Sequence, residues 1–129
     1  MNKVVGTITT TNRQILVGDH HIVVDVPVAT GEANITMGTL LYRDDGDYKA
    51  LALADIATVD PVAVALEDMT GTADDSVIVA ALHGAVIAEK LTFKDGSAIT
   101  EDAAVALQAA GIYALGKVEP NPAPASGGN

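Results

Sequence analysis

Three histidines carry the most versatile side-chain chemistry in this sequence. His20 and His21 are adjacent, and His83 stands beside Gly84 within an apolar run. Imidazole binds metal ions and acts as a general base near neutral pH. Neighbouring side chains of a strand point to opposite faces, however, so His20 and His21 cannot converge on one ion unaided. We therefore expect no metal site at this pair, and we interpret His83 as a structural histidine at a bend.

The acidic turn DDGD at residues 44–47 is a second candidate, because calcium binds carboxylate oxygens. An EF-hand loop requires alternating oxygen ligands, a glycine at its sixth position and a glutamate at its twelfth, and this stretch lacks that register. Acidic residues continue as far as Asp75, and Lys49 is the one base among residues 44–75. We interpret this region as tight turns and solvated loops that keep the chain in solution.

Nucleophiles and phosphate-binding loops are also not indicated. Ser76, Ser97 and Ser126 lie in no GxSxG motif and next to no histidine. Gly71 and Gly116 belong to neither a P-loop nor a dinucleotide fingerprint. No sequence spacing selects one pair of carboxylates as general acid and base. A catalytic triad assembled from segments distant in the sequence would not be detected in this way. We therefore expect a protein that is not an enzyme, with no catalytic residue, no cofactor and no metal ion.

The charge of the chain limits its partners. Seventeen acidic residues against seven basic ones give a formal charge of −10, without any run of Lys or Arg. Nucleic acids and anionic membranes would repel such a surface, so we expect neither as a direct partner. Cysteine is absent, which excludes disulfides and thiolate metal sites. The N-terminus MNKVVGTITT has no apolar core of a signal peptide, and no segment approaches the roughly 20 apolar residues of a membrane span.

The elements that would position these side chains are mainly strands. The 129 residues and a hydrophobic content of 49% predict one compact core, built from aliphatic side chains because aromatic residues make up only 3%. Residues 3–28 have β character, with Ile22, Val24, Val26 and Val28 on one face. Pro27 favours an edge or a strand end, since it has no amide proton to donate.

Further strands follow along the chain. Residues 40–53 predict a hairpin with its turn at 44–47, and a strand begins at Pro61. Residues 76–82 and 85–93 predict two strands separated by a bend or bulge near His83 and Gly84. A helix over AALHGAVIAEK is the alternative for this region, because propensity alone does not exclude it.

One helix is indicated near the C-terminus. Asp95 and Gly96 predict a turn, and Thr100 is placed to cap a helix whose first turn carries Glu101 and Asp102. A narrow stripe of small residues would face the core, and Gly111 would end the helix before a strand at 112–115. The stripe consists of Ala103, Ala106, Leu107 and Ala110. The predicted fold class is therefore mainly β with one short helix (α+β).

Four segments, taken in order, resemble the head decoration proteins of tailed bacteriophages of the lambda type. They are NITMGTLLYRDDGDYKALA, DPVAVALEDM, DSVIVAALHGAVIAEKLTF and ITEDAAVALQAAGIYAL. Together they span residues 34–115, roughly two thirds of the chain. The motifs consist of strands and small residues and contain no chemical signature.

The resemblance implies a small compact β-rich structural protein of the virion. Such a protein binds as a homotrimer at local three-fold positions of the expanded capsid, bridges subunits of the major capsid protein, and resists the pressure of packaged DNA. It would be made in the bacterial host cytoplasm and would lie on the outer surface of the capsid. Two other classes remain open, namely a small acidic metal-dependent hydrolase that uses His20, His21 or His83, and a fibre or tail adhesin module.

The family often contacts the shell through an N-terminal segment, and residues 2–17 are the candidate here. Val4, Ile8, Ile15 and Val17 are its apolar side chains and the possible capsid contacts. We expect an N-terminal β-like segment at 1–33, which is either such an arm or part of the body, and a decoration-protein core at 34–118. A disordered Pro/Gly-rich tail is expected at 119–129, since its composition cannot bury apolar area.

Overall fold

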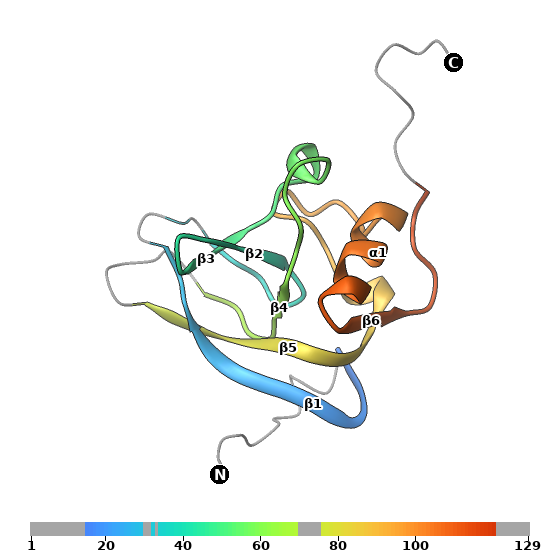
Figure 1. The fold of residues 1–129 in the computed structure, drawn as a ribbon, viewed down its shortest axis with the longest axis horizontal. Helices are drawn as coiled ribbons and strands as arrows, with labels where there is room; N and C mark the ends of the chain where they lie inside the picture. The colour runs from blue at the N-terminus through green and yellow to red at the C-terminus, as the bar shows by residue number, and fades with distance from the viewer. Residues whose placement is uncertain (1–14, 30–31, 33, 70–75, 121–129) are drawn as a thin grey trace.

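A computed structural model describes residues 15–29, 32, 34–69 and 76–120 of the chain (Figure 1). The fold is mainly β with one α-helix in this described part, which confirms the predicted class at that level. Two short 3-10 helices, Leu53–Asp55 and Ala88–Lys90, connect some of the elements. The strands are β1 (Leu16–Pro27), β2 (Leu40–Asp44), β3 (Asp47–Ala50), β4 (Ala63–Ala65), β5 (Val77–Ile87) and β6 (Ile112–Leu115), and the helix is α1 (Glu101–Ala109).

All six strands belong to one sheet with the order β1-β5-β4-β2-β3. The neighbours along this path are antiparallel, whereas β6 pairs with β5 in parallel, beside the half of β5 that extends past β4. The sheet curls, so that Val28, directly after β1, forms a parallel bridge with Tyr48 of β3. Pro27 is the last residue of β1, and a strand end is one of the two positions that its missing amide proton predicts.

The predicted hairpin is confirmed in β2 and β3, which pair from Leu41 with Ala50 to Asp44 with Asp47. Its central turn residues, Asp45 and Gly46, have φ of 55° and 91°. Two successive left-handed residues are typical of the tight turns that join twisted antiparallel strands. The Lys49 ammonium donates to Asp44 Oδ2 at 2.9 Å, and this hydrogen bond raises the pKa of Lys49.

One continuous strand, β5, occupies the region where two strands were predicted, so that prediction is wrong, as is the helical alternative. The irregularity near His83 and Gly84 exists, but it is a shift of register within β5 and β1 instead of an end of the strand. Gly84 absorbs it with φ of 120°. The sequence pattern therefore predicted the position of the distortion correctly, but it wrongly predicted that the distortion would divide the segment into two strands.

The helix α1 has the predicted boundaries. Gly111, which follows its C-cap residue, has a left-handed φ of 96°. Ala103 and Leu107 are fully buried, as the predicted stripe requires, whereas Ala106 and Ala110 are only half-buried. The prediction for the Thr100 side chain is wrong, since its hydroxyl makes no capping bond and is buried without a partner.

The sheet separates two groups of buried side chains. The first lies under α1 and includes Leu40, Val64, Val86, Phe93 and Leu107. The second lies on the other face of the strands, where the sheet curls over itself, and includes Val26, Leu41, Ala65, Ile78 and Ala80. Alternate residues of β4 enter different groups, with Val64 in the first and Ala63 and Ala65 in the second. Both faces of β4 are thus covered.

The structure can be compared with the three segments expected from the sequence, 1–33, 34–118 and 119–129. Residues 16–27 are an integral strand of the sheet, which favours the body over an arm for this part of the segment 1–33. At the other end, Glu119 forms a bridge with Thr100, and its amide donates to the Ile99 carbonyl at 2.9 Å. The paired backbone therefore continues one residue past 118. Residues 1–14 and 121–129 lie outside the described residues.

Candidate functional site

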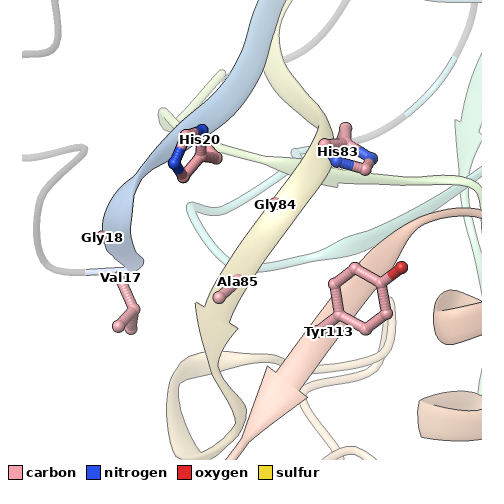
Figure 2. A pocket seen from close by; sticks show the side chains of 7 residues that line it. All are labelled: Val17, Gly18, His20, His83, Gly84, Ala85 and Tyr113. Carbon is pink, nitrogen blue, oxygen red and sulfur yellow. The ribbon is translucent and has the colours of Figure 1, made fainter.

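An open groove of about 250 Å³ lies where β1, β5 and β6 run side by side (Figure 2). Its lining is mostly apolar and comes from all three strands. The lining residues are Val17, Gly18, His20, His83, Gly84, Ala85 and Tyr113. Two of the three histidines of the sequence thus meet at one hollow of the sheet, from strands distant in the chain.

A large bulge in β1 shapes this groove. Val17 pairs with Ala85 and Ile22 pairs with His83, so the four residues between Val17 and Ile22 face only Gly84 of β5. Gly84 allows this because its missing side chain leaves room for β1. A Cβ there would lie 2.9 Å from the His20 carbonyl oxygen and 2.6 Å from a ring carbon of His21. Bulges of this kind bend a strand and redirect its side chains.

His83 is held by packing from one side of the groove. Its ring meets that of Tyr113 edge to face, with centroids 6.3 Å apart and planes at 85°. Gly111 also makes room for it, since a Cβ at Gly111 would lie 2.8 Å from His83 Nδ1. Such aromatic pairs fix the orientation of both rings. The interpretation of His83 as a structural histidine stays a prediction.

His20 and His21 are directed to different surroundings. His20 lines the groove, on the side across from His83 (Figure 2). His21 does not line it, and its Nε2 donates to the Val17 carbonyl at 2.8 Å, which ties the two ends of the bulge together. Nδ1 of His21 is buried without a partner. Within the described ranges, no three His, Asp or Glu side chains gather in an arrangement that would hold a metal ion.

Several acidic side chains have structural roles that the sequence did not predict. The Glu67 carboxylate accepts from the Val79 amide at 2.9 Å, and the Asp68 carboxylate accepts from the Met37 amide at 2.7 Å. Glu32 accepts from the Ala50 amide of the terminal strand β3 at 2.8 Å. The interpretation of the acidic region as solvated loops is therefore incomplete, since Glu67 and Asp68 belong to it.

The four possible capsid contacts fall into different surroundings. Val4 and Ile8 lie outside the described residues. Ile15 is 1% exposed and belongs to the buried group under α1, so its side chain is enclosed by its own chain instead of being offered to a partner. Val17 is half-buried and lines the groove.

Large apolar side chains are exposed around the groove. Ile22 is 52% exposed, Tyr113 44% and Leu115 48%, and Val24 is also exposed. Sequence reasoning placed Ile22 and Val24 on one strand face with Val26 and Val28, which are buried. The sequence did not predict that Ile22 and Val24 would be exposed and Val26 and Val28 buried, because this difference in exposure depends on which part of β1 the curled sheet covers.

Comparison with protein-family models, with curated proteins and with solved structures finds no match for this chain. No helix in the described part of the chain is long and apolar enough to cross a bilayer.

Proposed function

We propose that this chain is a structural phage protein that binds as a homotrimer to the expanded capsid and stabilises the shell against internal DNA pressure. The proposal rests on the resemblance of residues 34–115 to head decoration proteins of the lambda type. The observation on the molecule that supports it best is the exposed apolar surface of β1, β5 and β6, beside the edge of the sheet. Uncovered apolar patches of this kind are typical of surfaces that bind other proteins.

The contact with the shell is proposed to involve the edge strand β1 and the residues that precede it. An edge strand offers unpaired backbone groups to which an extended segment of a partner can add. Val4 and Ile8 lie before β1 in the sequence, and Val17 lies within it. Ile15 is left out of the proposed contact because it is buried.

The stabilising effect would arise by mass action. A protein that binds only the expanded form of the shell lowers the free energy of that form in proportion to its occupancy. Many weak contacts repeated over a shell would then sum to a large effect, without any chemical step.

Co-sedimentation with undecorated heads tests this function. The full chain should bind expanded shells in a saturable manner and should not bind unexpanded shells. Val17→Asp should weaken the binding, whereas Val105→Asp, on the exposed face of α1, should not. Failure of the wild-type chain to bind expanded shells would contradict the proposal. Metal analysis and glycan binding would then test the hydrolase and adhesin classes.

A further inference from the structure

We propose that Asp45 is a site of spontaneous covalent modification, at which the backbone isomerises to isoaspartate through a succinimide. This inference is independent of the proposed function. Asp45 precedes Gly46 in the turn between β2 and β3, and the chain contains one other Asp-Gly pair, Asp95 and Gly96. The two pairs differ in their hydrogen bonds, and that difference predicts which of them reacts.

The reaction needs only the chain and solvent water. The Gly46 amide nitrogen attacks Cγ of the protonated Asp45 carboxyl group, and the amide proton leaves with the carboxyl hydroxyl as water. The nitrogen of the resulting five-membered imide is bonded both to Cγ and to the backbone carbonyl carbon of Asp45. Water then adds to that carbonyl carbon, and its bond to the nitrogen breaks. The backbone now runs through Cγ, without any net gain or loss of atoms and without oxidation.

The two pairs offer equal access to the attacking nitrogen. Both aspartates and both glycines are exposed. Gly46 and Gly96 have left-handed φ of 91° and 89°, and a Cβ built on either would meet nothing within 4 Å. A side chain after the aspartate would hinder the attack, so the missing Cβ makes both bonds susceptible. Exposure and crowding therefore do not distinguish the two pairs.

At Asp95 and Gly96, hydrogen bonds hold both reacting groups. The Asp95 carboxylate accepts from the Ser97 amide at 3.1 Å, and the Gly96 amide donates to the Phe93 carbonyl at 2.9 Å. The Phe93 amide donates to the Ser97 carbonyl at 2.8 Å, and the Phe93 side chain is 1% exposed. This turn is thus closed on itself and anchored in the buried group under α1. Its carboxyl group can reach the Gly96 nitrogen only after these bonds break.

The protonation of Asp95 acts in the same direction. The hydrogen bond from the Ser97 backbone amide lowers the pKa of Asp95. A carboxyl group with a lowered pKa is protonated to a smaller extent at a given pH. The succinimide forms from the protonated carboxyl group, because its hydroxyl leaves as water. The reaction at Asp95 is therefore slowed further at mildly acidic pH.

At Asp45 and Gly46, neither reacting group is held in this way. Within the part of the chain that the structure describes, no carbonyl accepts from the Gly46 amide and no donor bonds to the Asp45 carboxylate. The strand pairing ends at Asp44 and Asp47, so it does not include the two residues between them. Asp45 has a φ of 55°, which is unfavourable for a residue with a side chain. This strain favours departure from the native turn.

Isomerisation at Asp45 would lengthen the turn that joins β2 to β3 (Figure 1). The isoaspartate linkage adds one methylene carbon to the backbone between the paired residues Asp44 and Asp47. The length of such a turn fixes the register of a hairpin. The modification would therefore loosen β3, the terminal strand of the sheet, beside the hydrogen bond from Lys49 to Asp44.

Peptide mapping of the aged full chain tests this assignment. The folded protein is kept at mildly acidic pH, and samples taken over time are digested with trypsin. The two aspartates fall into different peptides, because Arg43, Lys49 and Lys94 separate them. Isoaspartate has the mass of aspartate, so methyl transfer by a protein-isoaspartate methyltransferase identifies the modified peptide. Isoaspartate should form at Asp45 about tenfold faster than at Asp95, where two hydrogen bonds must first break.

The chain unfolded in guanidinium chloride is the matched control. Its turns and their hydrogen bonds are lost, so the two pairs should react at similar rates. An equally large preference for Asp45 in the unfolded chain would overturn the assignment, because the flanking sequence would then determine the rate. A folded chain that reacts at Asp95 as fast as at Asp45 would also overturn it. So would a folded chain that reacts at neither aspartate while the unfolded chain reacts at both.

Asp45→Glu tests the identity of the modified residue. Its longer side chain would have to close a six-membered imide, which forms far more slowly, so the methylation of this peptide should be lost. Methylation that persists in this variant would place the modification at Asp44 or Asp47 and would contradict the assignment to Asp45.

Discussion

Glu67 illustrates how much a single side chain contributes to this sheet. The Leu66 amide donates to the Val79 carbonyl at 2.8 Å, and the Val79 amide donates to Glu67 Oε2 at 2.9 Å. The carboxylate thus replaces the backbone carbonyl that β4 would have supplied if it were longer. Such a bond protects a partly buried amide that would otherwise lack an acceptor.

Replacement of Glu67 tests this role. Glu67→Ala should lower the free energy of unfolding by about 1–3 kcal/mol, the range for leaving a buried donor unsatisfied. Asp60→Ala is the control, because Asp60 is an exposed acid of the same region, and its effect should stay within about 0.5 kcal/mol. Urea unfolding followed by circular dichroism measures both. Equal stability of the two variants would mean that Glu67 is only a solvated acid.

At the scale of elements, the bulge of β1 depends on close contact with Gly84. This glycine combines a left-handed φ of 120° with a lack of space for a side chain. Gly18, at the other side of the bulge, also has a left-handed φ, of 80°, but a Cβ there would meet nothing within 4 Å. A side chain would therefore strain the backbone at both glycines, but it would clash with neighbouring atoms only at Gly84.

Alanine substitutions should have unequal effects at these two positions. Gly18→Ala should cost about 1–2 kcal/mol of stability through backbone strain alone. Gly84→Ala should cost clearly more, because the new Cβ would also force β1 away from β5. Thermal unfolding of both variants provides the comparison. A Gly84→Ala variant no less stable than Gly18→Ala would contradict the close packing of the bulge against β5.

Sequence reasoning succeeded where structure is decided locally. The turn at Asp45 and Gly46 and the helix from Glu101 to its end at Gly111 were predicted because nearby residues determine them. The continuity of β5 was missed, since the partners of that strand come from residues distant in the sequence. The groove and the role of Glu67 could not be predicted for the same reason, because both require the register of the sheet.

At the scale of the whole molecule, charge and apolar surface are separated. Many of the acidic residues lie in turns and loops, while β1 and β6 expose aliphatic and aromatic side chains. Repulsion between like-charged copies keeps such a protein in solution and limits productive contacts to the uncharged surface.

The central claim is that binding of this chain stabilises an expanded shell. The most direct measurement is the temperature at which undecorated expanded shells come apart, recorded by light scattering at increasing concentrations of the full chain. This temperature should rise with occupancy and level off when the shell is saturated, as linkage requires. Saturating binding that leaves the temperature unchanged would contradict the claim.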